Sequence, residues 1–195
     1  MAPCTRVGAL PRGLARTAVA IAAAALGVVV WPATLAGAAT ATATITGGSL
    51  AFVSAPPNVS FSDTLDGTNQ TVTATEALDV SDATGSNAGW SITATSTTFT
   101  TGTVTLATTA TSATSTPTHA CDAGSSCTLA TNGVAYPYTL PAAASAPTAT
   151  KVYNAAANTG EGNETVTVTW SLAVPATTAP GTYTSTWTLS LVSGP

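Results

Sequence analysis

Three pairs of carboxylates have a spacing that could support metal binding or acid–base chemistry. They are Asp63 with Asp66, Asp79 with Asp82, and Glu161 with Glu164. Two carboxylates that flank a glycosidic bond can cleave it, and carboxylate oxygens are ligands for calcium. The segment from Asp63 to Gly67 lacks the alternating ligands of a calcium loop, and Asp at a turn usually accepts hydrogen bonds from its own backbone. The sequence therefore favours turn formation, with calcium binding and glycoside hydrolysis as alternatives.

The chain has one histidine, His119, next to the cysteine pair Cys121 and Cys127. A catalytic triad would require His119 to meet a distant Asp and Ser with hydrogen-bond precision, and a metal site would need further ligands. We expect instead a solvated loop histidine, no metal, no cofactor and no enzymatic activity. In an exported protein the two cysteines are expected to form a disulfide that pins a local turn and contributes about 2 kcal/mol.

Three tryptophans, Trp90, Trp170 and Trp187, offer broad apolar faces that could stack on sugar rings. The alternative is burial in a core. Trp170 alternates in register with Val168 and Leu172, and Trp187 does so with the leucines that follow it, as in a strand with one buried face. Burial is favoured for all three, in which case the ligand would meet nearby loops.

The elements that position these residues are predicted to be β-strands. Thr makes up 39 of residues 39–195, and β-branched side chains fit a pleated surface better than a helix. Residues 165–174 and 183–191 alternate apolar and polar types, and we expect them to pair as an antiparallel hairpin. Further short strands are expected around residues 50–52, 59–61, 72–74, 78–80, 90–92 and 104–106.

The middle of the chain has a different composition. Residues 108–118 and 141–150 consist almost wholly of Thr, Ser, Ala and Pro, so we expect exposed loops there, with an edge strand within 134–140. The predicted fold is all-β, an antiparallel β-sandwich of Ig-like or Greek-key type with a loop-rich central elaboration at 108–160. Residues 39–195 are expected to form a single domain.

The amino-terminal segment has the pattern of a signal peptide. Arg6, Arg12 and Arg16 precede an apolar run from Thr17 to Trp31, and small residues follow up to Ala38. The run is shorter than the roughly 20 residues that span a bilayer as a helix. We expect residues 1–38 to be removed and the protein to be secreted.

Removal of that segment would leave a strongly acidic chain. Lys151 would be the only lysine or arginine against eight carboxylates, a formal charge of −7. Such a chain has no basic patch for phosphates, so neither nucleic acid nor, after signal cleavage, a membrane is an expected partner.

Two stretches resemble the halves of a WxL domain. They are Leu78-Asp79-Val80-Ser81-Asp82 followed by Gly89-Trp90-Ser91-Ile92-Thr93-Ala94, and the closing Tyr183-Thr184-Ser185-Thr186-Trp187-Thr188-Leu189. The resemblance implies a surface protein of Gram-positive bacteria, outside the cell and associated with the wall, that attaches non-covalently to peptidoglycan. It also implies a wall-binding motif at Trp90, Ile92, Trp187 and Leu189. Ile92 replaces the usual Leu, a conservative change in volume and β-propensity.

Two functional hypotheses of different classes follow. In the first, the chain binds peptidoglycan or another wall glycan, alone or with other surface proteins. In the second, it is a structural subunit that builds a fibre or layer by strand addition between copies, with residues 39–46 as a possible donor.

Overall fold

The computed structural model describes residues 38–195, so the predicted signal peptide lies outside the described residues except for Ala38. Thr44–Pro195 form one compact unit. Its strands are β1 (Leu50–Phe52), β2 (Gln70–Asp82), β3 (Trp90–Thr97), β4 (Thr111–Ala113), β5 (Thr118–Cys121), β6 (Tyr138–Thr139), β7 (Ala142–Ala143), β8 (Thr150–Ala155), β9 (Gly162–Val174) and β10 (Trp187–Ser193). Within residues 38–195 no helix is long and apolar enough to cross a membrane.

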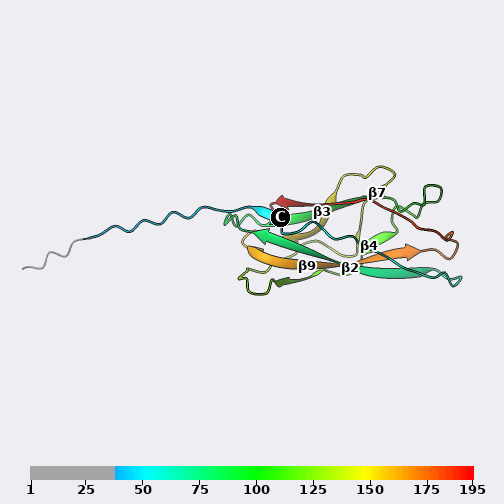
Figure 1. The fold of residues 1–195 in the computed structure, drawn as a ribbon, viewed down its shortest axis with the longest axis horizontal. Helices are drawn as coiled ribbons and strands as arrows, with labels where there is room; N and C mark the ends of the chain where they lie inside the picture. Colours follow the sequence, from blue (N-terminus) through cyan, green and yellow to red (C-terminus); the bar gives the residue numbers. More distant parts are fainter. Residues whose placement is uncertain (1–37) are drawn as a thin grey trace, which may run out of the picture. The chain divides into compact units, whose positions relative to one another are not determined.

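The strands form two sheets that pack face to face (Figure 1). The first sheet has the order β1-β2-β9-β4-β6, and β5 also pairs with β9. In the second sheet β3 is central, with β10 on one side and β7 and β8 along the other. All pairings are antiparallel except that of β3 with β7. The predicted all-β sandwich is therefore confirmed.

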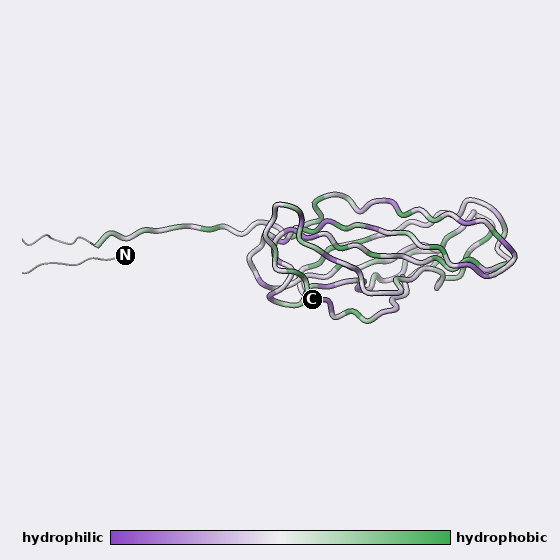
Figure 2. Tube along the Cα trace, turned by 90° about the horizontal axis from the view of Figure 1, so that it is seen from below, coloured by the Kyte–Doolittle hydropathy of each residue, from purple (hydrophilic) through white to green (hydrophobic). Residues whose placement is uncertain are grey.

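The longest ladder joins β2 to β9, from Gln70 opposite Val174 to Asp82 opposite Gly162. Along β9 the apolar side chains are buried and the intervening Thr side chains are partly exposed, as the alternation predicted. Figure 2 shows that hydrophobic and more polar stretches are interspersed along the whole folded chain. The inner faces of both sheets build the main core, whose largest fully buried apolar members include Trp90, Trp170, Tyr153, Leu78 and Ile92.

The predicted hairpin between residues 165–174 and 183–191 is wrong. β9 belongs to the first sheet, whereas β10 pairs with β3 in the second, with Trp187 opposite Ser96. The reason is that both edges of β9 are already occupied, by β2 on one side and by β4 and β5 on the other. The connection at 175–186 therefore crosses from one sheet to the other.

The expectation of an exposed loop at 108–118 is also wrong in part. Thr111–Ala113 form β4, which pairs with β9 and places the fully buried Ala113 opposite Trp170. A small side chain fits there because the tryptophan beside it fills the space. Conversely, the structure has no strand at 59–61, and near 104–106 it has only an isolated bridge between Thr100 and Thr105.

Candidate functional site

The two tripeptide motifs lie on neighbouring strands but at opposite ends of their ladder. Trp90 is opposite Ser193, and Trp187 is opposite Ser96. Six residues along β3 separate the two positions, which corresponds to about 20 Å. All four residues point toward the same side of the sheet. Directly opposed residues share a face, and Trp90 and Ser96 are an even number of positions apart on β3. The structure therefore does not bring the motifs together into one site.

Trp90 and Ile92 have a structural role. Both are fully buried, and the Trp90 ring packs against Tyr153 with centroids 5.9 Å apart. The indole Nε1 donates a hydrogen bond of 2.9 Å to the Gly160 carbonyl, so the tryptophan fixes the loop that enters β9. Gly160 has a φ of +79°, and an added Cβ would lie 2.6 Å from that same Nε1. The predicted burial of Trp90 is confirmed, and so is that of Trp170.

Trp187 and Leu189 are only half-buried. The Trp187 ring contacts Trp170 edge-on, with centroids 5.0 Å apart, and lies 6.4 Å from Phe99 and 6.5 Å from Phe61. This cluster holds one part of the indole in the core. The remainder is at the surface, so the expectation of burial is met only in part for Trp187.

A groove of about 620 Å³ runs along Trp187. One wall is residues 56–59, and the other is the segment 183–189, which leads into β10. Three aromatic side chains line it, Phe99, Tyr183 and Trp187, together with Leu189 and Glu76. Threonine and serine residues of the second wall add hydroxyl groups. The groove thus combines apolar ring surface with hydrogen-bonding groups, as sites for sugars and small polar ligands do.

Glu76 is the one ionisable carboxyl group that lines this groove. It is 1% exposed, and its Oε2 accepts a hydrogen bond of 2.7 Å from Trp170 Nε1. Burial raises the pKa of Glu76 above its usual value, although the bond from Trp170 opposes that shift. Sequence reasoning missed this residue. The available signal was its position in β2, where Glu76 takes an inward place between Ala74 and Leu78 that the alternation reserves for apolar side chains.

A second cavity of about 820 Å³ adjoins the first, and both are lined by Val59, Phe99 and Tyr183. Its other lining residues are mostly apolar and include Phe61 and Leu106. Together the two hollows follow the segments 56–65 and 178–189. These segments carry the second tripeptide motif but not the first.

The two aspartate pairs have structural roles. Asp63 and Asp66 accept hydrogen bonds from the backbone N–H groups of residues 64 and 68, and the bonds from Thr68 lower the pKa of Asp66. Asp82 serves Thr84 in the same way, so the turn role is confirmed for these three. Asp79 is of opposite parity to Asp82 in β2 and faces the other side of the sheet. No group of three or more potential metal ligands occurs within residues 38–195.

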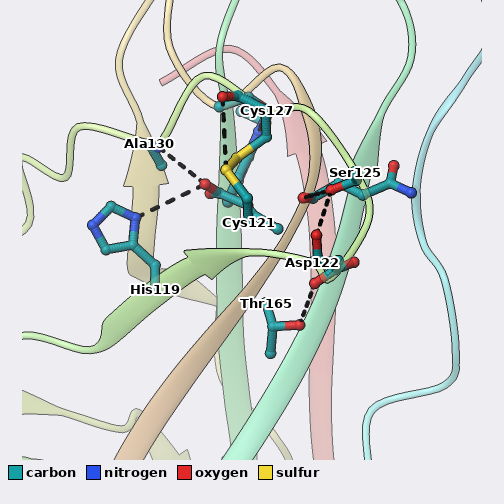
Figure 3. The surroundings of a disulfide bond; sticks show 11 residues. His119, Cys121, Asp122, Ser125, Cys127, Ala130 and Thr165 are labelled. Atoms are coloured by element: carbon teal, nitrogen blue, oxygen red, sulfur yellow. Dashed lines mark hydrogen bonds and ion pairs between the residues drawn. A yellow bond between two sulfur atoms is a disulfide. The ribbon is translucent and has the colours of Figure 1, made fainter.

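His119 is not a solvated loop residue, contrary to expectation. It lies in β5, its side chain is 28% exposed, and its Nδ1 is 3.8 Å from Oε2 of the buried Glu164 (Figure 3). Pairing of β5 with β9 places the histidine opposite Val166. The same Oε2 accepts a bond from the Ala130 N–H, while burial raises the pKa of Glu164.

The disulfide between Cys121 and Cys127 is present, as predicted. It closes a short loop at the end of β5 (Figure 3). Within that loop Ser125 Oγ donates to the Asp122 carbonyl, and outside it Thr165 donates to the Asp122 carboxylate. The bridge therefore fixes a turn against β9. None of the residues in this turn lines the groove.

Comparison with known proteins identifies one family. The model of a WxL domain, described as surface and cell wall-binding, matches residues 38–195. No curated protein and no solved structure gives a significant match.

Proposed function

The chain belongs to the WxL family of cell wall-binding surface domains, and we propose that it is secreted and attaches non-covalently to peptidoglycan through the groove beside Trp187 and Leu189. The family is one of binding domains, and its location is the cell surface in association with the wall. The single observation that supports the groove is the half-buried Trp187, whose free indole surface forms part of the wall. Trp90, by contrast, is fully enclosed and shapes the fold.

The electrostatics disfavour the anionic part of the wall as ligand. The described chain has one lysine, no arginine and eight carboxylates, so anionic wall polymers and phosphate head groups would be repelled. Sugar rings and peptide groups can instead meet the aromatic faces and the hydroxyl groups of the groove. Attachment through such contacts would persist at high salt, because screening weakens only charge–charge attraction.

The test is sedimentation of residues 39–195 with purified peptidoglycan at low and high salt. Trp187→Leu removes the indole surface but keeps apolar bulk against Trp170, so the variant should fold. Val192→Ala is the matched control, since it lies on the same strand and faces away from the groove. We expect salt-resistant binding that is lost in Trp187→Leu and kept in Val192→Ala. Absence of sedimentation for the unaltered chain would reject the proposal.

A surface fibre or layer is the second candidate. Its support is Ile45, which is 93% exposed in a strandless segment of alternating Ala and Thr, together with β10 at a sheet edge. Strand addition between copies would cover both. Light scattering of the chain with and without residues 39–46 tests this candidate. Concentration-dependent growth that requires the segment would favour it.

A further inference from the structure

Glu76 is a buried carboxyl group without a cationic partner. Its only side-chain hydrogen bond within residues 38–195 comes from the neutral indole of Trp170. Lys151 is the sole lysine or arginine in that part of the chain, and its Nζ donates to the Pro195 oxygen. A buried charge is ordinarily paired, so the groove contains a carboxyl group whose negative charge, when it ionises, the protein itself leaves uncompensated.

The side chains around this carboxyl group are suited to a cation. Phe99, Tyr183 and Trp187 line the same groove, and the Phe99 and Trp187 rings are nearly perpendicular, at 78°. Aromatic faces attract ammonium groups through their quadrupole, most strongly where water is excluded. An acidic group together with several aromatic walls is the usual combination for recognition of an alkylammonium ion.

We propose that the groove binds a ligand that carries a free ammonium group, with Glu76 as its counterion and the three aromatic side chains around it. This inference rests on the proposed function, because it specifies the chemistry of the wall ligand at the same groove. Two sources can supply such a group, an amino sugar without its N-acetyl substituent or a free amine on a peptide. Neutral N-acetylated sugars would lack the charge that compensates Glu76.

The pH dependence follows from the same pairing. Burial favours the neutral form of Glu76, and a bound ammonium group favours the ionised form. Affinity should therefore decrease as the pH falls and Glu76 takes up a proton. The other titratable side chain that lines the groove is Tyr183. If Glu76 acted instead as a protonated donor to a sugar hydroxyl group, affinity would increase on acidification.

The first experiment uses small probes and Trp fluorescence at pH 7 and pH 4.5. Glucosamine and N-acetylglucosamine form one matched pair, and Nα-acetyl-lysine amide and its Nε-acetylated form are the other. We expect each amine to bind at least tenfold more tightly than its amide wherever it is a true ligand, and to bind less well at pH 4.5. The pair with the larger difference identifies the source of the ammonium group. Equal binding of amine and amide in both pairs would overturn the inference.

Two variants separate charge from structure. Glu76→Gln keeps an oxygen to accept the Trp170 Nε1 hydrogen bond and removes only the charge. Asp66→Asn removes the same charge at an exposed turn that does not line the groove. The discrimination between amine and amide should vanish in Glu76→Gln and persist in Asp66→Asn. Its persistence in Glu76→Gln would contradict the assigned counterion.

Binding to intact cell wall then separates two claims, that the groove binds the wall and that it recognises a free ammonium group. Acetic anhydride converts free amines of peptidoglycan into neutral amides without removing the glycan or peptide. We expect the untreated wall to sediment the protein and the acetylated wall to do so at least tenfold less. Equal sedimentation by both preparations would reject the ammonium group and leave wall binding intact. Sedimentation by neither would reject both.

Discussion

Substitution of Gly160 tests whether the first tripeptide motif acts through the fold. Gly160 has a φ of +79°, and its carbonyl accepts the Trp90 Nε1 hydrogen bond. In Gly160→Ala the new Cβ would lie 2.5 Å from the Ala155 Cβ and 2.6 Å from Trp90 Nε1. Neither neighbour has room to move, because both are fully buried.

Two costs combine in this variant. A residue with a Cβ in the left-handed region costs about 1–2 kcal/mol, and overpacking in a core costs about 1–3 kcal/mol more. We therefore expect the free energy of unfolding to decrease by about 2–5 kcal/mol. Gly67→Ala is the matched control. Its φ is +86°, but an added Cβ would have no neighbour within 4 Å, so it should show only the backbone cost of about 1–2 kcal/mol.

Urea unfolding, followed by tryptophan fluorescence and circular dichroism at neutral pH, measures both variants. The same slope of free energy against urea for all proteins would show that the midpoints report stability. Equal destabilisation by Gly160→Ala and Gly67→Ala would refute the packing of Trp90 against the loop before β9. Folded Gly160→Ala should still bind the wall, because the groove lies at the other end of the ladder.

Three further outcomes are expected. Burial raises the pKa of Glu76 in the folded state, so the wild-type protein loses stability as the pH rises above the usual pKa of 4.5. Glu76→Gln lacks this titration, and the difference in Tm between Glu76→Gln and wild type should therefore shift in favour of the variant between pH 4 and pH 8. A difference in Tm that stays constant over this range would contradict the prediction. Trp170→Phe leaves that carboxyl group without its donor and should lower the free energy of unfolding at pH 7 by about 1.5–3 kcal/mol, measured in urea. Replacement of Cys121 and Cys127 by Ser should cost about 2 kcal/mol by the same measurement and leave wall binding unchanged.

The strands with strong alternation were predictable, but their partners were not. The alternation of apolar and polar residues from Thr165 to Val174 is enough to predict a half-buried strand. Turn residues after Val174 indicate only that the chain reverses, and not which sheet it joins. That choice depends on the thirteen-residue ladder with β2, a contact distant in sequence. β4 was not predicted, because it also depends on a contact distant in sequence. Thr111–Ala113 have little apolar surface, and only their pairing with the strand that carries Trp170 makes them a strand.

The motif residues were identified from sequence, but the division of labour between them was not. A Trp at an inward position can be enclosed or can remain at a rim, and only the surrounding segments decide. Residues 56–59 and 183–186 leave part of Trp187 free, whereas Gly160 and Tyr153 enclose Trp90. Glu76 was not predicted as a groove residue. The only sign in the sequence is that it occupies a position of the strand that should face inward, and its neighbours in the sequence give no further indication.

The scarcity of basic side chains has a consequence for survival outside the cell. Proteases that cleave after lysine or arginine find a single target within residues 38–195, the bond that follows Lys151. That bond lies inside β8, where Lys151 is opposite Thr93 of the central strand of its sheet. An extended strand held in a ladder cannot enter a protease active site until it detaches. Trypsin-like digestion of the folded domain should therefore be limited by the opening of the sheet rather than by the supply of cleavable bonds.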